Sequence, residues 1–177
     1  MAQADGWDDS CDWPRRLLHV ETMVSYLWQP GNKYGDHIEP PYNALSYTWG
    51  RWELKDGENP DVNALHIKDI PWKVPRIDPA HFTADKLLST IRVATIQNTS
   101  SNVTPVNFVW LDIACIDQAQ DLEENTSEVG RQAKISKKSA NVFAWLTSFK
   151  SDSSFKTWFE QSVLTFKSWL CHANWGA

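Results

Sequence analysis

A nine-residue segment, Phe108 to Ile116, is apolar at every position except Asp112, and it constrains the fold more than any other part of the chain. An apolar run without alternation is typical of a strand that is covered on both faces. The run is far shorter than the roughly 20 residues that cross a bilayer as a helix. We therefore expect a buried central strand that contains one carboxylate.

Weaker patterns on both sides of this run predict further strands and helices. Short apolar or alternating runs predict strands at 16–20, 23–28, 44–49, 65–67, 72–74 and 141–146, and the first two and the 65–74 pair are expected as hairpins. Helical spacing predicts helices at 83–97, 128–139 and 153–170, with Thr83 and Ser127 as N-caps. Strands that alternate with helices favour an α/β fold, with a mainly parallel sheet flanked by helices and short N-terminal β-hairpins.

The same patterns divide the chain into three parts. Residues 1–15 are acidic and small, which predicts a flexible leader, and residues 16–150 hold the α/β domain. Residues 151–177 are expected to form an amphipathic C-terminal helix and a tail. We expect the apolar stripe of that helix to pack on the sheet, and the alternative is a docking or membrane-disrupting helix.

Charge and cysteine content argue against several classes of function. A formal net charge of −5 and a pI near 5.5 disfavour a phosphate-binding surface, so we expect no nucleic-acid partner. Three cysteines far apart in sequence fit neither a disulfide framework nor a metal site, and we expect no metal. The seven glycines form no phosphate-binding pattern, and we expect no cofactor. The absence of a secretory signal and of a transmembrane segment predicts the cytoplasm. Eleven tryptophans favour surfaces for protein partners or self-association.

Asp112 is the first candidate for chemistry, because a buried carboxylate needs a partner. It either faces a cleft as a functional charge or accepts hydrogen bonds from backbone amides or from a buried arginine such as Arg131. Cys115, in the same run, is expected to be a buried and inert thiol. Glu124 and Glu128 are expected near Arg131 on a solvated helix face, with an ion pair three residues apart.

Polar residues follow both central strand patterns, and ligands of open parallel sheets bind beyond the strand ends. If the two strands are neighbours, one crevice would be lined by Trp49, Gly50, Arg51, Asp112, Asp117 and Gln118. The alternative is that Asp117 only caps its own loop by bonding downstream amides. Both interpretations remain open at this point.

Two long blocks carry a family resemblance. Tyr42-Asn-Ala-Leu-Ser-Tyr-Thr-Trp-Gly50 and Val109-Trp-Leu-Asp-Ile-Ala-Cys-Ile-Asp-Gln118 resemble, in the same order, the first two signatures of the fungal heterokaryon incompatibility (HET) domain. A third block is similar but eroded at Glu124, Val129, Ile135 and Trp145-Leu146. The positions that match the motifs most clearly are Ala44, Leu45, Ser46, Tyr47, Trp49, Gly50, Trp110, Asp112, Cys115, Ile116, Asp117, Gln118 and Glu124.

The chain departs from the family pattern in and after the third block. Asn125, Ser136 and Thr147 stand where the family often has Arg, Tyr and Gly. The later Arg-x-Trp-x-x-Gln-Glu block of the family is absent, since nothing between residues 146 and 177 matches it. The resemblance covers roughly residues 16–150, so the chain looks like an incomplete family member.

The resemblance implies a signalling or effector module in fungal non-self recognition and programmed cell death, a form of innate immunity. HET domains are themselves distantly similar to Toll/interleukin-receptor (TIR) domains, which implies a TIR- or flavodoxin-like fold. Some TIR domains cleave NAD with a glutamate that would belong to the absent block, so we expect no enzyme. The alternatives are a TIR-like nucleotide-binding or NAD-cleaving enzyme and a decayed, non-functional fragment.

Overall fold

The computed structural model describes residues 11–48, 50–95, 106–118 and 123–145. All of these belong to one compact unit that ends at Trp145. The predicted helix at 153–170 lies outside the described residues, and so does residue 49 of the first family block. Within the described part, none of the helices is both long and apolar enough to cross a bilayer.

The described residues form short strands and short helices. The strands are β1 (Arg16–His19), β2 (Val24–Gln29), β3 (Lys33–Tyr34), β4 (His37–Ile38), β5 (Tyr42–Tyr47), β6 (Phe108–Trp110) and β7 (Val142–Trp145). The helices are the 3-10 turn η1 (Gly50–Trp52), α1 (Ala84–Val93), α2 (Asp112–Cys115), α3 (Glu123–Gly130) and α4 (Gln132–Lys138). The predicted strands at 44–49 and 141–146 and the helix capped by Thr83 are confirmed within a few residues.

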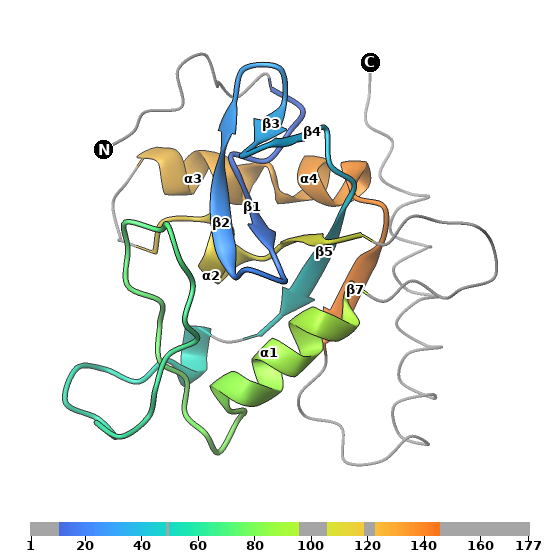
Figure 1. The fold of residues 1–177 in the computed structure, drawn as a ribbon. Helices are drawn as coiled ribbons and strands as arrows, with labels where there is room; N and C mark the ends of the chain where they lie inside the picture. Colours follow the sequence, from blue (N-terminus) through green and yellow to red (C-terminus); the bar gives the residue numbers. More distant parts are fainter. Residues whose placement is uncertain (1–10, 49, 96–105, 119–122, 146–177) are drawn as a thin grey trace, which may run out of the picture. The chain divides into compact units, whose positions relative to one another are not determined.

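The described strands join one curled, mixed sheet in the order β4-β3-β2-β1-β6-β5-β7 (Figure 1). Neighbouring strands from β4 to β6 are antiparallel. Among the described strands, β5 is parallel to both of its neighbours, β6 and β7. The prediction of a mainly parallel sheet flanked by helices, of TIR or flavodoxin type, is therefore wrong.

The position of the opening hairpin explains why the sheet is mixed rather than mainly parallel. The sequence predicts the hairpin correctly, and β1 and β2 pair with Leu17 opposite Tyr26. However, β1 also pairs with β6, with Leu18 opposite Val109, so the hairpin extends the sheet through its centre. The segment 30–41, for which the sequence predicts no strand, then adds β3 and β4. Alternation identifies a strand, but it does not identify the neighbours of that strand.

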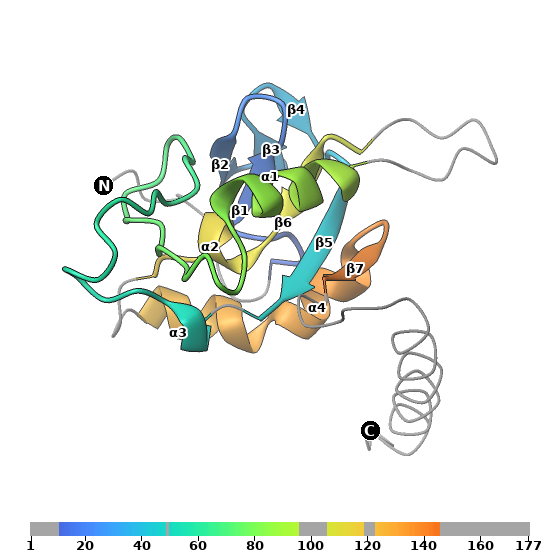
Figure 2. The same cartoon turned by 90° about the horizontal axis from the view of Figure 1, so that it is seen from below.

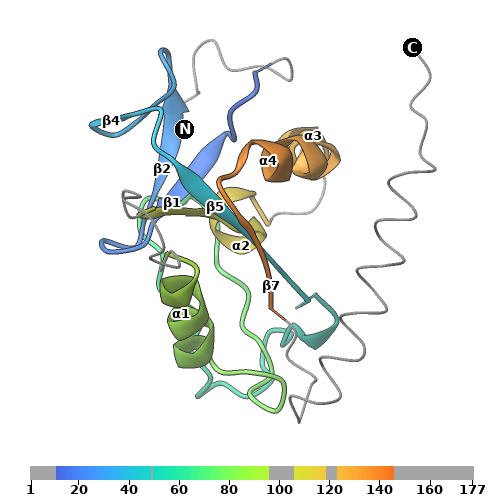
Figure 3. The ribbon, with the colours of Figure 1, turned by 90° about the vertical axis from the view of Figure 1, so that its right-hand side faces the viewer.

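Alternate residues of β5 contact two different helical layers. The Tyr42 hydroxyl donates to the Ile135 carbonyl in α4 at 2.7 Å. The side-chain amide of Asn43 donates to the Ala94 carbonyl, at the end of α1, at 2.6 Å. Figures 2 and 3 show α1 and α4 on opposite sides of β5. The motif strand is therefore covered on both faces, as period-two side-chain alternation allows.

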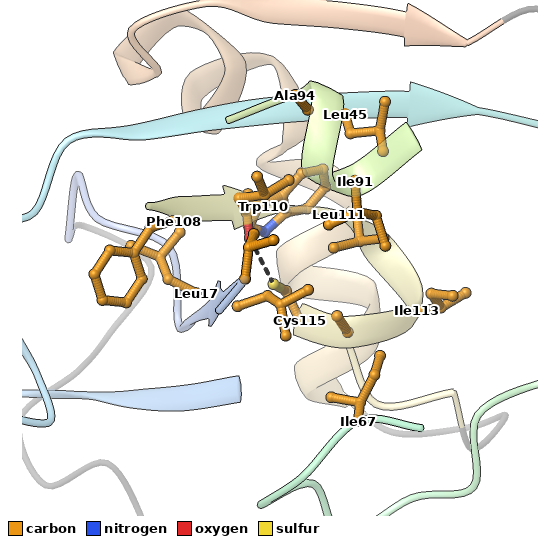
Figure 4. Close-up of a cluster of buried hydrophobic side chains, with 14 of the residues drawn as sticks. Leu17, Leu45, Ile67, Ile91, Ala94, Phe108, Trp110, Leu111, Ile113 and Cys115 are labelled. Atoms are coloured by element: carbon orange, nitrogen blue, oxygen red, sulfur yellow. Dashed lines mark hydrogen bonds between the residues drawn. The ribbon is translucent and has the colours of Figure 1, made fainter. Parts of the chain in front are cut away.

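The apolar segment 108–116 is not one strand. β6 ends at Trp110, and the chain turns into α2, which buries Ile113, Ala114 and Cys115 in the core (Figure 4). Asp112 begins this helix and its carboxylate accepts the Ile113 N–H at 2.8 Å. A continuous apolar run does not distinguish a buried strand from a buried helix, and this one contains both.

Two further predictions are wrong in detail. Residues 65–67 and 72–74 form no hairpin in the described chain; Leu65, Ile67 and Val74 enter the core from an irregular segment. The predicted helix 128–139 divides at Arg131 into α3 and α4, and α3 begins before the expected N-cap Ser127. In both segments the backbone follows the burial of apolar side chains rather than the regular structure that sequence periodicity predicts.

Candidate functional site

The two family blocks lie side by side in the sheet. β5 pairs with β6 in parallel, and Ala44 stands opposite Trp110. On its other side Ala44 stands opposite Val142 of β7. Register partners point to the same face, so Val142, Ala44 and Trp110 form a row across three strands. The small alanine at the centre of this row leaves room between two larger side chains.

A pocket of about 120 Å³ occupies this place. It lies where α4 approaches the C-terminal ends of β5 and β6, and it is lined by residues of the sheet, of α2 and of α4. The lining residues are Ala44, Leu45, Ser46, Tyr47, Trp110, Asp112, Gln132, Ser136 and Val142. Six of them, Ala44, Leu45, Ser46, Tyr47, Trp110 and Asp112, match the family motifs identified in the sequence.

Asp112 is the half-buried carboxylate of this pocket. Its carboxylate accepts the Ile113 N–H, and its own carbonyl accepts the Ile116 N–H at 2.8 Å. The sequence offers Arg131 as one partner for Asp112, but Arg131 forms its ion pair with Glu128. In the pocket, the carboxylate of Asp112 lies close enough to Tyr47 to act on the pKa of that residue.

Tyr47 places a buried hydroxyl beside Asp112. Burial raises the pKa of Tyr47 well above its ordinary value, and the neighbouring carboxylate of Asp112 raises it further. The ring packs against Phe82 and Trp145, with ring centroids 6.1 Å away in each case. Tyr47 is therefore a neutral hydroxyl at neutral pH, fixed by aromatic contacts at the base of α1 and on β7.

The remaining residues of the predicted crevice are only partly brought together. Trp49 lies outside the described residues, and Arg51 and Glu124 are described by their backbone alone. Gly50 begins η1 and is exposed. Asp117 and Gln118 are half-buried, and the Gln118 amide donates to the carbonyls of Asp112 and Ile116, at 3.1 and 2.7 Å. The pocket thus gathers Asp112 with Tyr47 and α4 rather than with Gly50, Asp117 or Gln118.

Sequence reasoning missed the contribution of α4. Gln132 and Ser136 line the pocket from that helix, but the sequence assigned no site role to either residue. One signal was present: Ser136 stands where the family often has Tyr, so the chain carries a small side chain where a large one is common. A serine in place of an aromatic ring opens space against the sheet.

Cys115 is inert, as expected. It is buried, and its thiol lies 3.9 Å from the Val109 carbonyl. Burial raises the pKa of Cys115 to about 12, while a backbone hydrogen bond from Leu111 opposes that shift in part. A thiol with such a pKa contributes almost no thiolate at neutral pH, and thiolate is the reactive form.

Glu128 and Arg131 form the predicted ion pair at 3.5 Å, but the prediction of a solvated face is wrong. Both side chains are buried, with 2% and 9% of their surfaces exposed. The segment Cys11–Arg15 covers them: the Arg15 N–H donates to Glu128, and Arg131 donates to the carbonyls of Cys11 and Trp13. The pair therefore fastens the N-terminal segment to α3 and α4.

Comparison with known protein families identifies a relationship. A family model described as "Heterokaryon incompatibility protein (HET)" matches residues 42–170, which is more than half of the chain. The match begins at β5 and includes every residue that lines the pocket. The comparisons with curated proteins and with solved structures found no match.

Proposed function

Because the chain belongs to the heterokaryon incompatibility family, we propose that it is a non-enzymatic signalling module of fungal non-self recognition and programmed cell death. It acts in the cytoplasm, without a cofactor, by associating with a second copy of itself. The observation that carries this proposal is the edge of the sheet at β7, beyond which no further strand pairs among the described residues.

The backbone of β7 offers hydrogen bonds on its outer side. The Ala44 N–H donates to the Asn141 carbonyl at 2.9 Å, in a parallel ladder that places Ala44 opposite Val142. The backbone N–H and C=O groups of Asn141 and Phe143 therefore face β5, whereas the backbone groups of Val142 and Ala144 face away from it. In the described chain β7 is the last strand of the sheet, so this outer row supports the addition of another strand.

The side chains of β7 favour the same interaction. The strand Val-Phe-Ala-Trp carries no charge and no proline, which are the usual devices that protect an edge. Val142 is 55% exposed, and Ala144 is exposed as well. Two copies paired edge to edge would not oppose like charges within the strand. An antiparallel pair of identical edges is also self-complementary, as a two-fold interface requires.

Expression in a fungal host tests this proposal. Ala144→Pro removes an outward N–H and leaves the β5 ladder intact, so it should abolish cell death caused by induced expression of the chain. Ala144→Ser keeps the N–H and serves as the matched control, which should kill cells like the natural chain. Equal cell death with Ala144→Pro would contradict the role of the edge, provided that the variant accumulates to the same level.

Incubation of the purified chain with NAD tests the non-enzymatic part of the proposal. We expect purified chain to leave NAD intact. NAD consumption that Asp112→Asn abolishes in a folded variant would contradict the proposal and favour a nucleotide-cleaving enzyme. A chain that shows no cooperative unfolding transition would instead be a decayed fragment, since small domains ordinarily unfold in one transition.

A further inference from the structure

The N-terminal segment that covers Glu128 and Arg131 is held through its own backbone. Arg131 donates to the carbonyls of Cys11 and Trp13, and Glu128 accepts the N–H of Arg15. These contacts do not depend on the side chains of the segment, so another extended chain can form them equally well. Main-chain hydrogen bonds, combined with a few side-chain contacts, are a general way in which proteins bind linear peptides.

An acidic side chain of the segment adds a specific contact. The Asp12 carboxylate forms an ion pair with Lys134 of α4 at 2.9 Å. Lys134 lowers the pKa of Asp12, and Lys138 and Arg131 lower it further. Asp12 is therefore a carboxylate at neutral pH, and α4 presents positive charge to it. This surface favours an acidic residue at the same position of any bound chain.

Trp13 follows directly and lies among aromatic and cationic side chains. Its ring centroid is 6.2 Å from the centroids of both Tyr34 in β3 and Tyr42 in β5. Lys138 of α4 lies over the same ring, with its Nζ 4.5 Å from the centroid. Tryptophan is the aromatic side chain that attracts a cation most strongly to its face. The surface therefore favours a tryptophan immediately after the acidic residue.

The segment is replaceable, because its departure is compensated in part. The side chains of α3 and α4 that bind it lie within the family match at 42–170, whereas the segment precedes that match. Asp12 and Lys134 keep 67% and 43% of their side-chain surfaces exposed, so water can replace their ion pair at little cost. Departure of the segment also returns the buried pair of Glu128 and Arg131 to water, and charges are unfavourable to bury.

We propose that α3, α4 and the adjoining strands β3 and β5 form a peptide-binding surface for an extended segment of another protein, with an acidic residue directly before a tryptophan. The chain's own segment Cys11–Arg15 occupies this surface in cis and restricts access to it. A tethered occupant acts at an effective concentration of about a millimolar, so a weakened segment should admit a free peptide.

Fluorescence anisotropy on the full chain tests the inference. The probe is a labelled peptide of residues 11–15, blocked at both ends, with serine in place of Cys11. The variant Asp12→Ala/Trp13→Ala weakens the tethered segment and should bind the probe about tenfold more tightly than the natural chain does, or better. Asp12→Lys, at a largely exposed side chain, should bind it about threefold more tightly. This second variant keeps the test decisive if the double variant fails to fold.

A charge reversal and a second peptide locate the binding. In both variant chains, Lys134→Glu should weaken binding of the probe about threefold or more, because it opposes the carboxylate of the peptide. Lys137→Glu, the same charge change at another exposed lysine of α4, should leave the dissociation constant unchanged. A probe with alanine in place of tryptophan should bind neither variant chain.

Three results would overturn the inference. The first is equal binding of the probe by the natural chain and both variants, or binding by none of them. The second is equal weakening by Lys134→Glu and Lys137→Glu, which would place the probe elsewhere. The third is dissociation of assemblies of the natural chain by excess unlabelled peptide in sedimentation velocity, which would assign the surface to a second copy. None of the contacts described for this surface involves β7, so this test and the Ala144→Pro test fail independently.

Discussion

The antiparallel half of the sheet and the parallel half differ in what their side chains contact. In the antiparallel half, β1 to β4, His19, Tyr26 and His37 form a ring cluster with Phe108 of β6, and the buried Tyr34 hydroxyl donates to the Pro14 carbonyl. The parallel half, formed by β6, β5 and β7, contains the pocket and an edge strand without charged residues, β7. The antiparallel half ends at the other edge, where Ile38 of β4 is 65% exposed. The first two family blocks contribute β5 and β6 to the parallel half.

Breaking the link between the N-terminal segment and α3 should have the largest effect. Glu128→Gln removes the buried carboxylate that lies 3.5 Å from Arg131, which should lower the free energy of unfolding by about 3 to 5 kcal/mol. Denaturant unfolding measures this loss. In the double variant Glu128→Gln/Arg131→Met the loss should be smaller than the sum of the two single losses, because the two residues interact directly. Strict additivity would contradict this assignment.

Similar side-chain truncations should cost different amounts of stability in the two halves of the sheet. Leu17→Ala in β1 creates a cavity at a position with 0% exposure and should cost about 3 kcal/mol. Val142→Ala in β7 removes mostly exposed carbon and should cost less than about 0.5 kcal/mol. Thermal unfolding of the two variants checks the difference. Similar losses would show that the parallel edge is packed as tightly as the antiparallel half.

The cap of α1 should contribute a smaller amount. The Thr83 hydroxyl accepts the Lys86 N–H at 3.2 Å, and α1 covers one face of β5 through Leu87 and Ile91. Thr83→Ala should lower the free energy of unfolding by about 1 kcal/mol, whereas Thr83→Ser should keep most of the stability that the cap contributes. An unchanged stability in Thr83→Ala would mean that tertiary contacts alone fix the start of the helix.

The smallest expected effect is a pH dependence within the antiparallel half. Burial lowers the pKa of His19, the adjacent His37 lowers it further, and Glu21 opposes the shift. The unfolded chain therefore binds the proton more readily than the folded chain. The contribution of neutral His19 to stability is present above about pH 6.5 and is lost as the pH falls below that value. His19→Gln should reduce the loss of stability between neutral and acidic pH. His66→Gln, at an exposed position, should leave it unchanged.

Local features of the fold are predictable from the sequence, and neighbour relations are not. The opening hairpin, β5, β7 and the Thr83 cap follow from alternation, spacing and capping chemistry. The insertion of β1 beside β6 depends on contacts about 90 residues apart, and no local pattern encodes them. For the same reason, the sequence identified Asp112 as a carboxylate in need of partners but did not place Tyr47, Gln132 and Ser136 around it.

The burial of Glu128 and Arg131 is a second case in which local sequence patterns do not encode a long-range contact. Their spacing predicts the ion pair, but a covering segment more than a hundred residues earlier decides that the pair is buried. Charged residues near a helix start are usually solvated, so helix periodicity does not predict that this pair is buried. Tertiary contacts, rather than propensity, determine the environment of a charge.

Sedimentation velocity of the purified chain at increasing concentration tests the role of the β7 edge most directly. We expect the natural chain and Ala144→Ser to associate as concentration rises, whereas Ala144→Pro should remain monomeric with an unchanged unfolding temperature. Association of a folded Ala144→Pro variant at the same concentrations as the natural chain, or a natural chain that stays monomeric throughout, would contradict the claim that copies of this chain pair through the edge of their sheet.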